Sequence, residues 1–256
     1  MSRLRAKCPA CNTFTAVALG PDYQCHACGA EFRAGMVRVP RAWGDGGEAM
    51  VESASLPFPY PEAAVIEEGS LKEQSLALAL DLPERPLVLG GCCCSHVGAV
   101  EGLHARHGRI AVVWLDAHGD LNTPESSPSG NEWGMPLRML IDSGAVRAGD
   151  VALIGARNLD PPEEAFIEES GVHLDAFQGA LEGIEATYVA LDCDVFEESE
   201  VASFMPEPGG LTLYEVGELF ADINPRATVV GMGLTGLAPR QESVEPLVEL
   251  CRKLGF

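Results

Sequence analysis

The sequence lacks any apolar stretch long enough to cross a membrane. A spanning helix needs about 20 apolar residues, and charged or polar residues interrupt every hydrophobic run well before that length. The first residues, MSRLRAKCPAC, carry charge without the apolar core of a secretory signal. We therefore expect neither a transmembrane helix nor a signal peptide.

Positive charge is also scarce. The 256 residues include 17 Lys and Arg against 38 Asp and Glu, which gives a formal net charge of −21. A nucleic-acid backbone would be repelled by such a surface, so we expect no nucleic-acid partner for the main body of the chain. An excess of carboxylates instead suits hard divalent cations.

The nine cysteines do not form the framework of a small secreted disulfide domain. Four form two Cys-x-x-Cys pairs, three are consecutive at Cys92–Cys94, and Cys193 and Cys251 stand apart. This distribution favours a reducing cytoplasmic location and a metal site.

Residues 1–34 are typical of a zinc ribbon. Cys8 and Cys11 are followed after 13 residues by Cys25 and Cys28, and four thiolates complete a closed structural Zn²⁺ site. The segment is too short to build a core, so metal binding would supply most of its folding free energy. Two roles stay open: a docking module for protein or nucleic acid, and a stapled extension that packs on the main domain or a neighbouring subunit.

In residues 35–256, predicted strands alternate with helices, which indicates an α/β domain with a mainly parallel sheet. The predicted strands are Arg85–Leu89, Ile110–Leu115, Val151–Ile154, Thr187–Leu191 and Ala227–Val230, besides a short strand near Met36. The predicted helices are residues 62–82, Val97–His107, Met135–Ser143, Glu163–Ser170, Leu211–Phe220 and Ser243–Leu254. Thr212 with Glu215 three residues later has the pattern of a capping box.

Two of these strands end in acidic motifs. Ile110–Leu115 runs into Asp116-Ala-His118-Gly-Asp120, and Thr187–Leu191 runs into Asp192-Cys-Asp194. Carboxyl ends of parallel strands meet at one edge of a sheet, and residues two apart on a strand face the same way.

Four carboxylates crowded in a dry crevice would repel one another unless cations neutralise them. Oxygen ligands with one imidazole suit Mn²⁺ better than Zn²⁺, and two such ions could activate a shared water toward an electrophilic carbon. The alternative is a set of helix caps and Asx turns in the loops that follow the strands.

From about Val37 onward the chain resembles the ureohydrolases, the family of arginase, agmatinase and formimidoylglutamase. The resemblance lies in Asp116-Ala-His118-Gly-Asp120-Leu-Asn122-Thr123, in Asp192-Cys-Asp194 and in Gly209–Thr212. It implies a three-layer α/β/α fold and a binuclear Mn²⁺ centre whose metal-bound hydroxide hydrolyses a C–N bond of an amidine or guanidine. It also implies an oligomer, a trimer or hexamer.

The same resemblance assigns roles to single residues. One ion would be held by Asp116, Asp120 and Asp192 with a ligand from the Gly90-Gly91 turn, and the other by His118, Asp116, Asp192 and Asp194. An amino-acid-like substrate tail would be bound at its carboxylate by Asn122, Ser129 and Asn131, and at its amino group by Asp160.

Three positions depart from the family pattern. Cys93 replaces the metal-binding His, and because a thiolate prefers softer ions than Mn²⁺, the first ion is lost, weakened or changed. Trp133 replaces a proton-shuttling His, and indole carries no proton near neutral pH. Gly236 or Thr235 stands where the family has a Glu that pairs with the substrate guanidinium.

We therefore predict a metal-dependent hydrolase of a small guanidino or amidino compound with one or two Mn²⁺ and one structural Zn²⁺. Asp120 would orient the attacking water or bind the first ion, and Trp133 would replace acid catalysis by shape. A catalytically weak member with a binding or regulatory role is the first alternative. A cysteine nucleophile at Cys93 is the second, and we interpret His96 as an ordinary helix residue.

Overall fold

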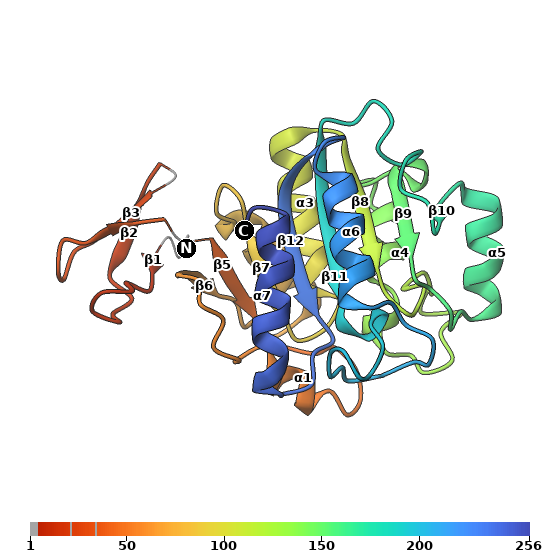
Figure 1. Ribbon diagram of the computed structural model, residues 1–256, viewed down its shortest axis with the longest axis horizontal. Coiled ribbons are helices and arrows are strands. Elements are labelled where there is room, and N and C mark those ends of the chain that lie inside the picture. The colour runs from red at the N-terminus through yellow and green to blue at the C-terminus, as the bar shows by residue number, and fades with distance from the viewer. Residues whose placement is uncertain (1–4, 21, 34) are drawn as a thin grey trace.

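The computed structural model describes residues 5–20, 22–33 and 35–256, so the first four residues of the predicted zinc ribbon lie outside it. The described chain forms an N-terminal sheet of four strands and a main sheet of eight strands with helices on both faces (Figure 1). The α/β/α architecture expected from the sequence is confirmed.

The main sheet has the strand order β10-β9-β8-β11-β12-β7-β5-β6, and every neighbouring pair is parallel. In chain order its strands are β5 (Met36–Val39), β6 (Glu62–Val65), β7 (Leu87–Gly90), β8 (Ile110–Leu115), β9 (Val151–Ile154), β10 (His173–Leu174), β11 (Ala186–Asp192) and β12 (Thr228–Thr235). The central strands β8 and β11 are buried along their whole length, as their continuous apolar sequences predict.

Helices cover the two faces of this sheet. The helices of the described chain are α1 (Glu48–Ser53), α2 (Leu71–Asp81), α3 (Ser95–His107), α4 (Pro136–Asp142), α5 (Pro161–Ser170), α6 (Leu213–Ile223) and α7 (Val244–Lys253). Residues of α2, α3 and α4 share one apolar cluster with the sheet, while α6 and α7 belong to a second cluster. Figure 1 shows α6 and α7 in front of the sheet and α3 behind it. No helix in the described part of the chain could cross a membrane.

The predicted and observed bounds differ most in three elements. The predicted helix over 62–82 begins only at Leu71, because residues 62–65 form β6, a short edge strand that pairs with β5. Strand β12 runs to Thr235, beyond its predicted end, because after an irregularity at Val230 the residues from Gly231 to Thr235 pair continuously with β11. Helix α6 begins after Thr212, whose capping box with Glu215 is present.

The N-terminal sheet consists of β1 (Arg5–Ala6), β2 (Ala16–Leu19), β3 (Asp22–Cys25) and β4 (Glu31–Phe32), paired in antiparallel order. It lies at the β6 edge of the main sheet, where the backbone N–H of Lys7 donates to the carbonyl of Glu62 over 2.8 Å. Ala6 and Tyr23 are buried in a cluster shared with the main domain. The segment thus packs on its own main domain, one of the arrangements that the sequence left open.

Candidate metal centre

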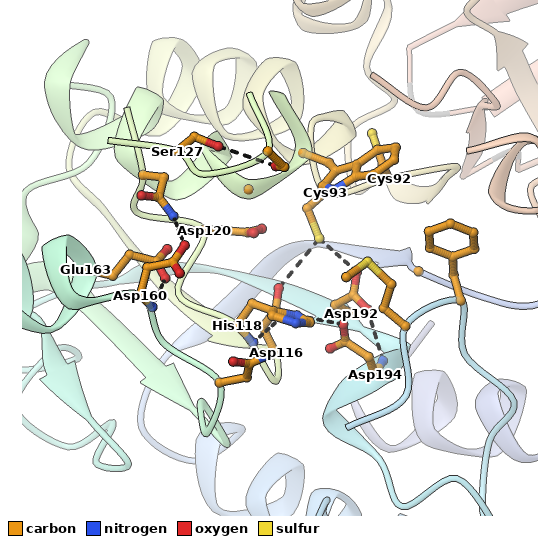
Figure 2. Close-up of a pocket in the computed structure, with 18 of the residues that line it drawn as sticks. Cys92, Cys93, Asp116, His118, Asp120, Ser127, Asp160, Glu163, Asp192 and Asp194 are labelled. Atoms are coloured by element: carbon orange, nitrogen blue, oxygen red, sulfur yellow. Dashed lines mark hydrogen bonds and ion pairs between the residues drawn. The ribbon is translucent and has the colours of Figure 1, made fainter. Parts of the chain in front are cut away.

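The acidic motifs converge at the carboxyl ends of the central strands. Asp116 follows β8 directly and Asp192 is the last residue of β11, the parallel neighbour of β8. Cys93 comes from the turn between β7 and α3. A pocket of about 200 Å³ opens there, and its lining includes Cys93, Asp116, His118, Asp120, Asp192 and Asp194 (Figure 2).

The expected alternation of two aspartates along a strand is wrong in detail. Asp194 lies beyond the end of β11, in a one-turn 3-10 helix, Cys193–Val195, whose start is capped by Asp192. The Asp194 backbone N–H donates to Asp192 Oδ1 over 2.9 Å. Asp120 reaches the pocket from a left-handed backbone with φ of 52°. Turn geometry therefore gathers these carboxylates, while Cys193 points into an apolar cluster.

Two overlapping groups of possible ligands share Asp116 among the described residues. In the first, Cys93 Sγ lies 2.9 Å from Asp192 Oδ2 and 3.6 Å from Asp116 Oδ2. In the second, His118 Nδ1 lies 3.0 Å from Asp194 Oδ2 and 3.5 Å from Asp116 Oδ1. Within each group the ligand atoms lie within 4.8 Å of one another, so each could surround one ion.

Burial makes this cluster electrostatically costly. Burial and the charge of Asp194 raise the pKa of Asp192 to about 7, and burial followed by the charge of Asp116 raises that of Asp194 to about 6. Burial by itself lowers the pKa of His118, but Asp116 and Asp194 raise it to about 12. The carboxylates thus need more positive charge than one imidazolium supplies.

Asp120 is the remaining carboxylate. Its side chain is buried, its Oδ2 has no hydrogen-bond partner among the described groups, and burial raises its pKa well above the ordinary value. A buried polar atom without a partner is rare unless it meets an ion or water. The donor set therefore fits divalent cations.

Cys93 is a poor nucleophile in this setting. Its thiol is buried, and burial together with the charge of Asp192 raises its pKa well above the ordinary value. The thiol, not the thiolate, is therefore the stable form in the metal-free cluster, and only a thiolate attacks carbon readily. A nearby cation would reverse this preference, so the geometry favours Cys93 as a ligand.

Gly236 is one of the two residues matched to the family's Glu, and it brings no carboxylate to the pocket. A Cβ atom there would lie 2.0 Å from Asp192 Oδ1, and its φ is +66°, so the close approach of Asp192 requires glycine. The Gly236 carbonyl accepts a hydrogen bond from the Phe204 backbone over 2.8 Å. The Phe204 ring meets the Trp133 ring edge-on, with centroids 6.0 Å apart. This end of the pocket is therefore aromatic. Position 133 supplies no imidazole there, and position 236 supplies no carboxylate.

The other end of the pocket is polar. Asn122 Nδ2 donates to Asp160 Oδ2 over 2.8 Å, and Ser129 also lines the cavity. Asn131 does not line it, because its Oδ1 accepts from the Asp45 backbone over 3.0 Å. The predicted tail-binding residues are therefore only partly assembled at the pocket wall.

Other lining residues were not predicted from the sequence. Glu163 accepts from the backbones of Leu121 and Asp160, both over 2.9 Å, and so ties the acidic loop to the start of α5. Its position three residues after Asp160 is a capping-box signal that could have been noticed. Several others have no local signature in the sequence: Met50 comes from α1, and loops supply Ser127, Asn158, Phe204 and Met205.

The four N-terminal cysteines form a separate cluster. Cys8 Sγ lies 3.6 Å from Cys28 Sγ, and Cys11 Sγ lies 3.6 Å from Cys25 Sγ. All four sulfur atoms fall within 4.8 Å of one another. Four thiols at this spacing fit a tetrahedral Zn²⁺ ion.

A parallel three-layer fold with carboxylates, an imidazole and a thiol gathered at one sheet edge defines a candidate metallohydrolase. The chain belongs to the arginase family, because the Arginase family model matches residues 51–251. An arginase of Staphylococcus aureus (strain MRSA252) is 30% identical over 203 residues, 68% of this chain and 67% of that protein. For the arginase of strain COL the match is 36% over 118 residues, 42% of this chain and only 39% of that protein.

Solved structures agree on the fold. The arginase of Bacillus subtilis superposes with a TM-score of 0.76 at 22% identity, covering 86% of this chain and 97% of that one. The proclavaminate amidino hydrolase of Streptomyces clavuligerus gives 0.68 at 22% identity, covering 86% and 90%. At such identities the likeness extends to the fold alone.

Proposed function

We propose that the protein is a metal-dependent hydrolase that cleaves a C–N bond of a small guanidino or amidino compound. One observation carries the proposal: Cys93, Asp116 and His118 face Asp192 and Asp194 in one buried pocket. Family membership supports it, since relatives with this fold are named arginase, formimidoylglutamase and proclavaminate amidino hydrolase.

Two divalent cations would be held by the overlapping ligand groups. His118 with Asp116 and Asp194 offers one nitrogen and carboxylate oxygens, which suits Mn²⁺. Cys93 with Asp116 and Asp192 adds a thiolate, which suits a softer ion. When bound, such ions make water nucleophilic at neutral pH and polarise the carbon under attack. A third ion, Zn²⁺, would be structural, in the N-terminal cysteine cluster.

The side chains around this centre would bind and orient the substrate. Asn122, Ser129 and Asp160 offer an amide, a hydroxyl and a carboxylate to the polar tail of an amino-acid-like substrate. Trp133 and Phe204 would cover the planar amidine and exclude water. Asp120 Oδ2 lacks a partner among the described groups, so it can orient the attacking water and hold a proton for the leaving nitrogen.

The test is turnover of a panel of guanidino and formimino compounds by protein loaded with Mn²⁺. We expect release of urea, ammonia or formamide from at least one compound, and loss of that activity in Asp194→Asn. Asp175→Asn is the matched control, since Asp175 lies outside the pocket lining. Zinc as the sole bound metal, with no product from any compound, would refute the proposal.

One observation favours a binding protein without turnover as the second candidate. The aromatic end of the pocket, Trp133 with Phe204, offers no group to protonate a leaving amine. This candidate predicts that the Mn²⁺-loaded protein binds a compound of the panel in calorimetry and releases no product from it.

A further inference from the structure

A chain of buried polar side chains lies behind the candidate metal centre. His96, in the first turn of α3, is 0% exposed. Its ring contacts two aromatic rings edge-on, Trp114 of β8 with centroids 5.0 Å apart and Tyr188 of β11 with centroids 5.7 Å apart. His96, Trp114 and Tyr188 are not among the proposed metal ligands. They lie next to two residues that are, Asp116 and Asp192.

The hydrogen bonds of His96 have one consistent direction. Thr235 Oγ1 donates to Asp192 Oδ2 over 3.1 Å, the one direction open when Asp192 is ionised, as it would be when it binds a metal ion. Thr235 Oγ1 also lies 3.2 Å from Cys93 Sγ. His96 Nε2, 3.2 Å from Thr235 Oγ1, must then supply the proton of that contact. Nδ1 is left to accept from the Tyr188 hydroxyl over 2.9 Å. Burial lowers the pKa of His96 to about 3, which is consistent with a neutral ring carrying a single N–H.

A second arm runs from His96 to Asp116, the carboxylate that both ligand groups share. The Trp114 ring, held edge-on by His96, donates from Nε1 to Asp116 Oδ2 over 3.1 Å. The two donors that orient Asp116 and Asp192 from behind therefore both contact one imidazole. Asp116 and Asp192 each contact Cys93 Sγ, so they are the carboxylates beside the first ion.

The glycine at position 233 makes this arrangement possible. A Cβ atom on Gly233 would lie 2.6 Å from two atoms of the His96 ring and 2.4 Å from the Tyr188 hydroxyl. Within β12, Gly233 thus leaves space for the His96 ring. Two residues later, Thr235 accepts the hydrogen bond from the His96 N–H. The glycine at position 233 of the Gly-Met-Gly-Leu-Thr-Gly segment is therefore needed to make room for His96 and Tyr188, which the sequence alone does not reveal.

We infer that His96 is a positioning residue for the metal centre, which fixes the carboxylate of Asp192 through Thr235 and that of Asp116 through Trp114. The inference rests on the proposed metal centre. Partners that orient metal ligands from behind typically change metal affinity by about 10- to 100-fold when they are removed. His96 would act in this way at two carboxylates, without contacting an ion.

The experiment compares Mn²⁺ affinity, measured by calorimetry on the full chain, among isosteric variants. Thr235→Val removes the hydroxyl while preserving shape, and we expect it to weaken Mn²⁺ binding by about 10- to 100-fold. Thr235→Ser keeps the hydroxyl and should restore most of the affinity. Thr187→Val is the matched control, because Thr187 is 0% exposed in the same sheet and its hydroxyl has no partner among the described groups.

Three further variants test the imidazole and its outer partner Tyr188. His96→Gln retains an N–H that can reach Thr235. It should bind Mn²⁺ more tightly than His96→Leu, even if the two variants have the same midpoint of thermal unfolding. Tyr188→Phe removes only the outermost hydroxyl and should cause a smaller loss than Thr235→Val. These orderings follow from hydrogen bonding, so a purely structural role for His96 would not produce them.

Wild-type affinity in Thr235→Val, or an equal loss in Thr187→Val, would overturn the inference while leaving the proposed function intact. Wild-type protein that takes up no divalent ion beyond the ribbon zinc would instead overturn the proposed function, and the inference with it.

Discussion

Substituting Gly236 by alanine should damage both stability and metal binding. The left-handed backbone at φ of +66° costs an alanine about 1 kcal/mol. The new Cβ would lie 2.0 Å from Asp192 Oδ1, so the carboxylate must rotate away. It would then lose its hydrogen bonds from Thr235 Oγ1 and from the Asp194 backbone, together worth about 3 kcal/mol. We expect a total loss of about 4 kcal/mol in the free energy of unfolding.

Gly144→Ala is the matched control for this prediction. Gly144 has φ of +78° and nothing within 4 Å of a built Cβ, so only the backbone cost of about 1 kcal/mol applies. The assay is urea unfolding, with elemental analysis of the dialysed proteins. Equal destabilisation by the two substitutions, with unchanged manganese in Gly236→Ala, would refute the proposed contact with Asp192.

Three other predictions concern the same architecture. In metal-free protein, Asp192 contributes stability that is complete below its unfolded pKa of 3.8 and is lost as the pH rises through about 7. Wild-type minus Asp192→Asn unfolding free energies should therefore fall over this range, and Mn²⁺ should reverse the slope; a flat difference would contradict the shift. Arg157 donates to the carbonyls of Asp194, Glu207 and Pro208 at 2.7 to 3.0 Å, so Arg157→Lys should lower Mn²⁺ affinity in calorimetry, whereas Arg147→Lys should not. Cys25→Ser should remove one zinc per chain in elemental analysis and leave the pocket metal in place.

The central part of the fold follows from local sequence. Ile110–Leu115 has only apolar residues because both faces of β8 are covered by helices, and such a run is legible without homologues. The convergence of Asp116 and Asp192 follows from parallel pairing of the strands that precede them. These features depend on a few residues each and on a general rule about sheet edges.

Other features depend on distant contacts. Glycines at 231 and 233 indicate a turn, yet they lie inside β12, because Tyr188 and His96 fill the space where their side chains would be. His96 follows Cys93 by three residues, in the first turn of α3, and nothing local distinguishes it from a solvent-facing residue. Phe204 reaches the pocket from a loop between β11 and α6, and a loop path is not encoded in any periodicity.

The central claim is that the pocket at the ends of β8 and β11 holds divalent cations. Anomalous-scattering maps of crystals grown with Mn²⁺, recorded at the manganese and zinc edges, test it most directly. We expect a manganese peak between Asp116, His118 and Asp194, a second ion beside Cys93, and one zinc among the N-terminal cysteines. A zinc peak in the cysteine cluster with no anomalous density in the pocket would contradict it.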